Sequence, residues 1–502
     1  MTQRTALCGT TAILIALSGM AQADVTGAEV WENWKSAAES VGQTMTPGSV
    51  TQSGDTLTVS DLQISMELPE VAISGGIDGI KFRENGDGTV TISMSPSYTM
   101  SISPAAEGED VSIDIAISHD ALTMIASGSM DAITYDITAT AMTVALENLA
   151  VDGEVIEMLA ELVLSNIAGK YLVTAGEMTE VTTDLTASQM VINVDVNEPG
   201  GDGTFVMNLD YADIATSSAG SMMMIADPTA ISAALAAGMR SAGALTHGAA
   251  SFDVAFQDDS EQFSLNGTSD TGRFEVSLDA DALTYAFGNT GLAFAMSGSE
   301  IPLPEIAASI GELGFGIMMP VAQSTEPQDF SLNVTLADLS VSDMIWGMID
   351  GGGQLPHDPA TLIVDVAGQA NWLFDIFNPD TMMEVAGPMP GEIHSLDINQ
   401  VKLAIAGAAL TASGGFTFDM NNLGTFGGVP APTGALDVKL VGGNGLMDTL
   451  VAMGLLPEDQ AMGARMMMGL FTKPGDGDDT LVTKIEVDGA TGAVSANGQR
   501  LQ

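Results

Sequence analysis

The sequence has very little positive charge. It contains 13 Lys and Arg residues against 65 Asp and Glu residues, which gives a formal net charge of −52 at pH 7. Nucleic-acid phosphates and anionic lipid headgroups would repel such a chain, so we expect no nucleic-acid partner. The chain is nevertheless 46% hydrophobic and only 16% charged. This composition predicts folded regions with large apolar cores rather than an acidic disordered protein.

Cysteine is almost absent, since Cys8 is the single one. It lies within residues 1–23, which have the order of a cleavable signal peptide: Arg4, a short apolar stretch, and a small–x–small pattern that ends at Ala23. The apolar stretch is too short for a membrane span of roughly 20 residues. We therefore predict cleavage between Ala23 and Asp24, and a mature chain with neither a disulfide nor a transmembrane helix. The predicted location is the periplasm, with the cell surface or the external medium as alternatives.

Residues typical of catalytic sites are also scarce. The four histidines, His119, His247, His357 and His394, stand far apart and form no His-x-x-x-His pair that could build a zinc site. The sequence contains neither a Gly-x-Ser-x-Gly motif nor a phosphate-binding glycine loop. We therefore predict no catalytic residues, no metal and no cofactor, and a protein that is not an enzyme.

Two sequence features leave alternatives open. The acidic turns at 85–88 and 476–479 could bind calcium, although Asx-Gly clusters are also ordinary turn sequences. Methionine is abundant, with 32 residues and a run at 466–468. Methionine fills irregular cores and forms adaptable apolar surfaces, and its thioether can bind copper. Three consecutive helical residues diverge, however, so the run does not form a single metal site.

Apolar and polar residues alternate over most of the chain, and one segment shows the pattern without interruption. Its apolar positions are Val111, Ile113, Ile115 and Ile117. A period of two with one apolar face is typical of antiparallel sheet with one side in water. We predict a mainly β fold made of elongated, curved antiparallel sheet, with a short N-terminal helix and several helical inserts in the C-terminal half.

Local signals near the N-terminus support this interpretation. Thr26 and Glu29 have capping-box spacing at the start of the expected helix, whose apolar face includes Trp31. The alternation then slips by one residue at 60–61, which predicts a β-bulge. The Asn-Gly-Asp-Gly sequence at 85–88 lies between two alternating segments and predicts a hairpin.

Helical periodicity defines the inserts and suggests a division of the chain. Helices are expected at 228–239, 343–349, 446–453 and 458–471. We expect an N-terminal β-rich region at 24–245 that ends in a helix, and a C-terminal β-rich region at 246–502 with the other inserts. The tetrapeptide Asp-Ala-Leu-Thr occurs at both 120–123 and 281–284, which leaves open a two-fold repeat.

The C-terminal part of the chain resembles a known family. The sequence Leu-Pro-His-Asp-Pro-Ala-Thr-Leu at 355–362 is similar to a recurring element of an exported bacterial family, known as domain of unknown function family 2125. The segments Gly-Leu-Met-Asp-Thr-Leu at 445–450 and Gly-Leu-Leu-Pro at 454–457 are similar too. The resemblance covers about residues 330–502 and implies a Gram-negative cell-envelope protein. It implies no catalytic residue, because the family carries no assigned activity.

Three functional hypotheses follow. The first is a non-enzymatic envelope protein that binds a lipid or other apolar ligand on a sheet face, to which Val111, Ile113, Ile115 and Ile117 would contribute. Such curved sheets resemble those of groove-forming envelope proteins related to the AsmA family. We expect this face in the N-terminal sheet, since most expected helices lie in the C-terminal half. The second is a structural or partner-binding periplasmic protein. The third, an outer-membrane barrel, ranks last because only 5% of residues are aromatic.

Overall fold

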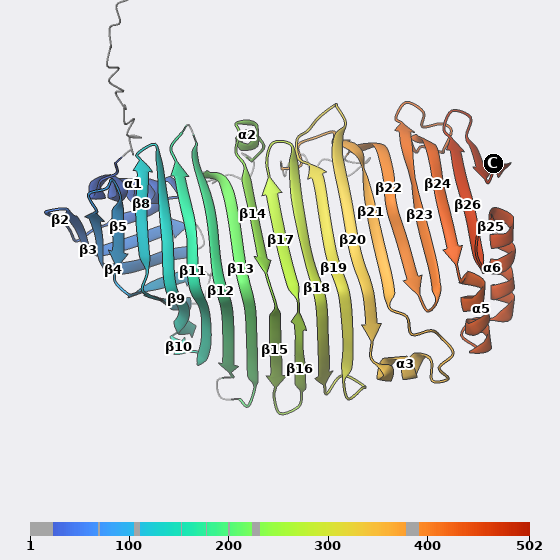
Figure 1. Cartoon of the computed structure of the whole chain (residues 1–502), viewed down its shortest axis with the longest axis horizontal. Coiled ribbons are helices and arrows are strands. Elements are labelled where there is room, and N and C mark those ends of the chain that lie inside the picture. Colours follow the sequence, from blue (N-terminus) through green and yellow to red (C-terminus); the bar gives the residue numbers. More distant parts are fainter. Residues whose placement is uncertain are drawn as a thin grey trace, which may run out of the picture.

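A computed structural model gives the fold. It describes residues 24–501 except 69–70, 105–110, 152, 177, 199–200, 223–230 and 378–390. The predicted signal peptide therefore lies outside the described residues. The described strands pair antiparallel into one continuous sheet that runs the length of the molecule (Figure 1). The mainly β fold predicted from the alternating pattern is confirmed.

The N-terminal end of the sheet is made of shorter strands and hairpins. They are β1 (Gln43–Thr46), β2 (Ser49–Ser53), β3 (Thr56–Leu68), β4 (Val71–Glu84), β5 (Val90–Met94), β6 (Ser97–Pro104), β7 (Val111–Asp120) and β8 (Thr123–Ser129). The turn between β4 and β5 is the hairpin predicted at 85–88, and the backbone N–H of Asn85 donates to the carbonyl of Thr89. Asp61 has a φ of 52°, which confirms the bulge predicted within β3.

The rest of the sheet contains many longer strands. Its central strands are β9 (Ala132–Val151), β10 (Glu154–Val155), β11 (Met158–Thr174), β12 (Thr179–Asn197), β13 (Thr204–Met222), β14 (Ser241–His247), β15 (Ala250–Gln257), β16 (Gln262–Ser269), β17 (Thr271–Leu278), β18 (Ala282–Gly298), β19 (Ile306–Pro320) and β20 (Gln328–Val341). The C-terminal strands are β21 (Ala360–Trp372), β22 (Gly391–Ile405), β23 (Ala408–Asp419), β24 (Ala431–Val441), β25 (Lys473–Pro474), β26 (Thr480–Asp488), β27 (Ala493–Ala496) and β28 (Gln499–Arg500).

From β9 onward the chain follows a simple meander. The strands β9, β11, β12 and β13 pair in that order, and the strands from β18 to β24 pair in sequence before β26. Between them, β14 and β15 both pair with β13, while β16 and β17 both pair with β18. In addition, β14 pairs with β17 and β15 pairs with β16. The strands β14 and β15 are therefore the two halves of one interrupted strand, and β16 and β17 are the two halves of the next.

A line of bends crosses the sheet near the middle of its long strands. Asn166, Asp213 and Asp338 have φ values of 50°, 51° and 57°, and Gly291 has 62°. A left-handed residue inside a strand makes a bulge and bends the strand. The interruptions between β14 and β15 and between β16 and β17 lie at the same level, because Gly248 N–H bonds to Ala212 beside Asp213 and Asp270 N–H bonds to Thr290 beside Gly291. We call this line the crease.

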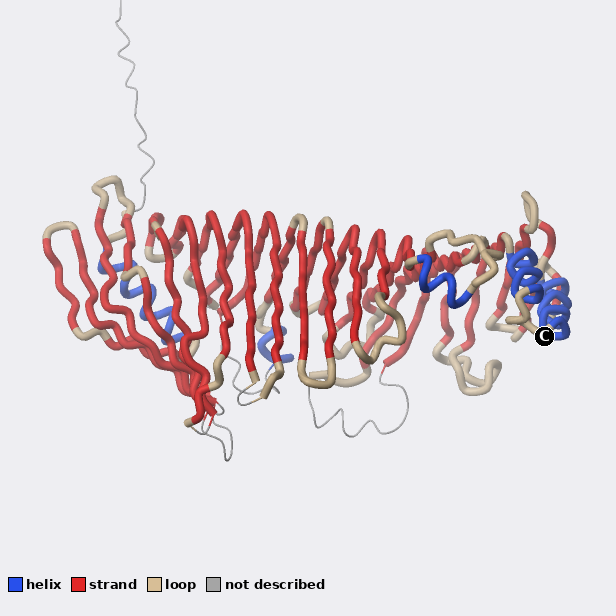
Figure 2. The backbone as a smooth tube through the Cα atoms, turned by 90° about the horizontal axis from the view of Figure 1, so that it is seen from below, coloured by secondary structure: helices blue, strands red, loops and turns tan. Residues whose placement is uncertain are grey.

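The crease folds the sheet into a trough. In Figure 2 the strands rise to a bend and descend again, so the sheet has two arms that meet at the crease. The upper arm contains β14 and β17 and the lower arm contains β15 and β16, as placed in Figure 1. Helix α1 (Gly27–Ser40) lies on the inside of the bend, where it packs on the sheet, and α2 (Ile231–Ala236) lies at the upper edge of the sheet in Figure 1. We call the enclosed side the inner face and the other side the outer face.

Helix α1 closes the N-terminal end of the trough. Its predicted capping box is present, because the Thr26 side chain accepts from the Glu29 N–H and the Glu29 carboxylate accepts from the Thr26 N–H. Val30 and Trp31 are 0% and 4% exposed and belong to a buried core that includes Phe82 of β4. The Tyr135 hydroxyl of β9 donates to Asn33 Oδ1 at 2.8 Å. The largest buried core of the described residues thus lies at this end.

The predicted helical inserts are largely confirmed. The helices α3 (Asp343–Ile349) and α6 (Glu458–Phe471) have the predicted bounds, and α5 (Gly443–Ala452) begins earlier than predicted. The helix expected at 228–239 was predicted too long at its C-terminal end, because Gly238 has a φ of 101°, which ends a helix. Its expected first residues, up to 230, lie outside the described residues. No described helix is both long and apolar enough to cross a membrane.

The predicted division and repeat can be placed on this fold. The boundary between 245 and 246 falls inside β14, where the sheet continues without interruption. The two Asp-Ala-Leu-Thr sequences occupy different positions: the first spans the break between β7 and β8, and the second leads from a hairpin turn into β18. This difference gives the suggested repeat no structural support.

Candidate functional site

The predicted apolar segment lies in β7 and contributes to one face of the sheet. Val111, Ile113, Ile115 and Ile117 alternate along this strand, and all four are half-buried. Ile115 is paired with Leu146 of β9, and Ile117 with Val144. Directly opposed residues of neighbouring strands share a face. The apolar face therefore continues from β7 into β9.

The same face crosses the lower arm from strand to strand. Leu162 of β11 is paired with Ile192 of β12, which is paired with Leu209 of β13. Leu209 is in turn paired with Phe252 of β15. Beyond β15, Val254 is paired with Leu265 of β16, Leu265 with Met296 of β18, and Met296 with Ile306 of β19. The apolar face is thus continuous across the lower arm.

The upper arm carries an aromatic cluster on three neighbouring strands. Phe274 of β17 lies 5.3 Å from Tyr285 of β18, between ring centroids. Phe315 of β19 lies 6.1 Å from both Tyr285 and Phe287. Phe274 and Tyr285 are still 38% and 36% exposed. The cluster therefore combines aromatic packing with free apolar surface.

These two apolar faces meet on the inside of the crease. A buried cluster joins Ile167, Ala187 and Ile214, which lie on the upper-arm side, to Leu164 and Met190 on the lower-arm side. Side chains from both arms can share one cluster only if they project from the same face. Helix α1, which lies inside the trough, packs on the same apolar surface at its N-terminal end. The inner face is therefore apolar along the lower arm and along the upper arm from β17 onward, whereas the upper arm between β12 and β14 also carries Thr183, Ser218 and Ser241 on this side.

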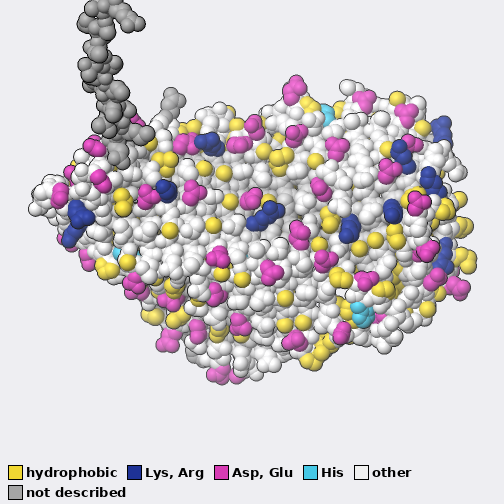
Figure 3. Space-filling view, viewed as in Figure 1, with side chains coloured by type: hydrophobic (Ala, Val, Ile, Leu, Met, Phe, Trp, Pro, Cys, Tyr) yellow, Lys and Arg dark blue, Asp and Glu magenta, His cyan; other side chains and the backbone are white. Residues whose placement is uncertain are grey.

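The outer face is polar and its side chains pair with one another. Asp114 accepts from Ser101 Oγ at 2.6 Å and from Asn148 Nδ2 at 3.2 Å. Gln189 donates to Asp210 at 2.9 Å on the strands that carry Ile192 and Leu209 on their other side. In Figure 3, acidic and basic side chains are spread over the visible face, with apolar groups in small separate patches. The alternating sequence thus separates polar and apolar chemistry between the two faces.

A cavity of about 420 Å³ lies on the inner face between β19 and β22. Its apolar lining residues are Ile317, Met319, Phe330, Leu332, Val366 and Ile393. The volume falls in the range of small-molecule sites, about 300–1,000 Å³. Trp372 also lines it and is fixed by a 2.6 Å hydrogen bond from Nε1 to the carbonyl of Pro320.

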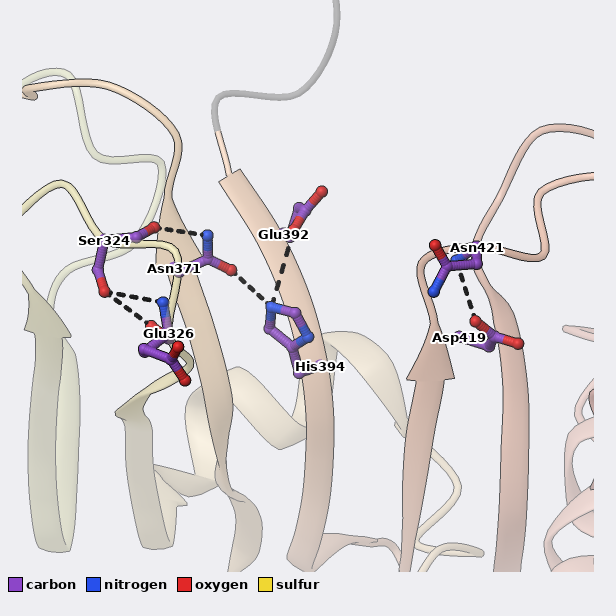
Figure 4. Close-up of polar contacts among 7 residues, drawn as sticks. All are labelled: Ser324, Glu326, Asn371, Glu392, His394, Asp419 and Asn421. Atoms are coloured by element: carbon purple, nitrogen blue, oxygen red, sulfur yellow. Dashed lines mark hydrogen bonds and ion pairs between the residues drawn. The ribbon is translucent and has the colours of Figure 1, made fainter.

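A polar cluster lies beside this cavity (Figure 4). The Asn371 side chain donates to the carbonyl of Ser324 at 2.9 Å, and its Oδ1 lies 2.6 Å from His394 Nε2. His394 Nε2 is also 3.8 Å from the Glu392 carboxylate. Asn371 is only 2% exposed, and its amide nitrogen and oxygen both have partners. The cluster therefore fixes β21 and β22 to the loop between β19 and β20.

The structure keeps the four histidines apart. His119 and His247 belong to β7 and β14, while His394 belongs to β22. His357 stacks on Trp346 of α3 with ring centroids 4.3 Å apart. Among the described residues, no group of three or more His, Cys, Asp or Glu side chains could hold a metal ion.

In both acidic turns a carboxylate accepts hydrogen bonds from the protein, within the turn for Asp87 and from the start of α5 for Asp479. Asp87 accepts from both the N–H and the hydroxyl of Thr89, and these hydrogen bonds lower the pKa of Asp87. Asp479 accepts from the Gly445 N–H and from Asn444, and its pKa is lowered mainly by the Gly445 hydrogen bond. Asp87 therefore stabilises its own turn, and Asp479 joins its turn to the first turn of α5.

The methionine run lies on α6. Met466 and Met467 are 66% and 54% exposed, whereas Met468 is half-buried. Helix geometry turns successive side chains by about 100°, so these three diverge. Met462, Met466 and Leu470 instead share one exposed side of the helix.

Comparisons of the chain with family models, with curated proteins and with solved structures found no match. The site is therefore defined by geometry alone. The predicted β7 segment lies on the inner face, and this apolar face extends beyond the N-terminal sheet into the C-terminal half of the chain. The sequence carries a sign of this longer face: on each side of a bulge, the apolar residues alternate so that they remain on the same face of the strand.

Proposed function

We propose that this protein binds long apolar molecules, such as acyl chains, along the inner face of the trough. The observation that carries the proposal is the length of the apolar face. Thirteen hydrogen-bonded steps separate β9 from β26. At about 4.8 Å for each step, the trough is about 60 Å long between these strands. An extended hydrocarbon chain fits such a surface without a deep closed cavity.

Partial exposure of the inner face gives binding a driving force. Several large apolar side chains of the inner face remain more than one third exposed: Phe263, Phe274, Ile393 and Leu403. Full burial of a large apolar side chain contributes roughly 1.5–3 kcal/mol. A chain that covers several half-exposed residues would therefore gain several kcal/mol. Contiguous apolar patches of this kind usually mark interaction surfaces.

We propose further that the protein acts in the periplasm after cleavage of residues 1–23 and is not an enzyme. The signal-peptide pattern supports the location. The resemblance to domain of unknown function family 2125 and the trough shape support a role in the cell envelope. A polar outer face and an apolar inner face suit a carrier whose ligand must be shielded from water.

A partner-binding role is the second candidate, and one observation favours it. Met462, Met466 and Leu470 are four residues apart on α6 and are 60–66% exposed. Adaptable methionine surfaces are common at protein-binding sites. Under this role, Met466→Asp should remove partner binding and leave acyl-chain binding to the trough unchanged.

The experiment that tests the proposed function compares two faces of the same strand. A fluorescent fatty acid is titrated into the wild type, Ile115→Asp and Ala116→Asp. Ile115 lies on the inner face, and Ala116, its neighbour in β7, lies on the outer face. We expect saturable binding by the wild type and Ala116→Asp, and binding weakened about tenfold or more in Ile115→Asp. Absence of saturable binding by the folded wild type, or equal affinity in the two folded variants, would contradict the proposal.

A further inference from the structure

One histidine on the inner face is held in place from three sides. The His247 ring packs edge-on against Tyr211, with ring centroids 4.9 Å apart. Its Nδ1 lies 2.8 Å from the backbone carbonyl of Gly248. Its Nε2 lies over Gly272, where an added Cβ would come within 1.9 Å of that nitrogen. Gly272 is thus needed to leave room for this ring.

The hydrogen bond to Gly248 determines which nitrogen can accept. A carbonyl oxygen only accepts, so Nδ1 must carry the proton in this contact. In the neutral ring, Nε2 is then a bare acceptor, and no described residue bonds to it. Because the ring is already fixed, this acceptor can bind a donor without further loss of conformational freedom.

Two further polar groups lie next to His247 on the same face. Asn289 lies two strands away from His247 in the same row of the sheet, because His247 is paired with Gly272 and Gly272 is paired with Asn289. Asn289 Oδ1 is buried and has no hydrogen-bond partner among the described residues. Buried polar atoms without a partner are rare in folded proteins and call for an explanation such as a bound molecule. The Tyr211 hydroxyl likewise has no partner among the described residues.

The surroundings restrict the chemistry of the group that could bind. Inner-face residues flanking these polar groups are Leu245, Phe274, Phe287 and Leu313. They supply no carboxylate to balance an ammonium and no cation to balance a carboxylate or phosphate, and burial of an unpaired charge is costly. An uncharged hydroxyl fits, because it can donate to His247 Nε2 and accept from Tyr211.

We propose that His247 is a recognition point for the hydroxyl group of an otherwise apolar ligand in the trough. This inference rests on the proposed function and adds the chemical class of the ligand, a long-chain alcohol or a lipid with a free hydroxyl. The apolar chain lies along the inner face, and the hydroxyl lies at the crease beside Tyr211, where it donates its single proton to His247 Nε2. In a lipid with a second hydroxyl, that group donates to Asn289 Oδ1, which has no partner among the described residues.

The test compares decan-1-ol with its methyl ether as competitors of the fluorescent fatty acid. The ether keeps the chain and the oxygen but lacks the donated proton. One hydrogen bond contributes about 1 kcal/mol, which corresponds to about a fivefold change in affinity. The ratio of alcohol affinity to ether affinity should therefore be about fivefold higher in the wild type than in a variant that lacks the acceptor. In His247→Phe the preference should fall by that factor, with the affinity for the ether unchanged. His357→Phe, which removes a histidine stacked on Trp346 outside this site, should behave as the wild type.

A second variant tests the same site with the histidine still present. Gly272→Ala places a methyl group where Nε2 lies and should displace the ring, so it should also lose the preference for the alcohol. An alcohol-to-ether ratio that is the same in the wild type, His247→Phe and Gly272→Ala would overturn the inference. The proposed function would still stand in that case, because the fluorescent fatty acid would still bind saturably. Loss of saturable binding by the wild type itself would overturn both.

Discussion

Substitution of Asn166 tests whether left-handed residues hold the crease. This residue has a φ of 50° inside β11, and its Nδ2 donates to Ser188 Oγ at 2.9 Å. Left-handed backbone costs an ordinary L-residue roughly 1–2 kcal/mol, and a β-branched side chain is among the worst in it. The exposed hydrogen bond adds less than about 1 kcal/mol. We therefore expect Asn166→Val to lower the free energy of unfolding by about 2 kcal/mol.

Two controls separate backbone strain from other effects of the substitution. Asn166→Gly loses the same hydrogen bond without strain and should stay within about 0.5 kcal/mol of the wild type. Ser165→Val puts the same side chain on the neighbouring residue, which lacks left-handed backbone, and should also have little effect. Urea denaturation followed by far-ultraviolet circular dichroism measures all three variants. Equal stability of Asn166→Val and Asn166→Gly would refute the assigned role of the left-handed residue.

Three further predictions concern the N-terminal core, high pH and processing. Phe82→Ala removes a fully buried ring that contacts Trp31 and Trp34, and the free energy of unfolding should fall by about 3–5 kcal/mol in urea denaturation; a loss below about 1 kcal/mol would contradict this core. Burial raises the pKa of Tyr135 in the folded protein. Above about pH 10 the tyrosine therefore ionises more readily in the unfolded chain, and the free energy of unfolding falls by up to about 1.4 kcal/mol per pH unit. Tyr135→Phe should flatten the decline in urea midpoint between pH 9 and pH 11, and an unchanged slope would count against that assignment. Intact-mass analysis of the exported protein should give a chain that begins at Asp24, whereas a mass that includes the signal peptide would exclude cleavage there.

Much of the fold could be predicted because side-chain alternation directly reports which face of a strand is apolar. The regular alternation of Val111, Ile113, Ile115 and Ile117 correctly predicted a strand with one apolar face. The capping-box pair at Thr26 and Glu29 marked the start of α1. These signals are local, so they can be interpreted without knowledge of the tertiary structure.

The trough itself could not be predicted, because it depends on how separate bulges line up. A left-handed Asp or Asn inside a strand is visible at most as a slip in the pattern, as at Asp61. Whether Asn166, Asp213 and Asp338 lie at one level follows from strand register, which the sequence does not state. The environment of His247 was missed for the same reason, since Tyr211, Gly272 and Asn289 come from three other strands.

The most direct test of the central claim maps where an acyl chain lies. A fatty acid with a diazirine near its end is bound to the mature protein and photolysed, and the labelled residues are identified by peptide mass spectrometry. The account predicts labels on inner-face residues from both halves of the chain, such as Met207, Phe252 and Ile317. Labels concentrated on outer-face residues such as Val206 and Asp253, or confined to α6, would contradict it.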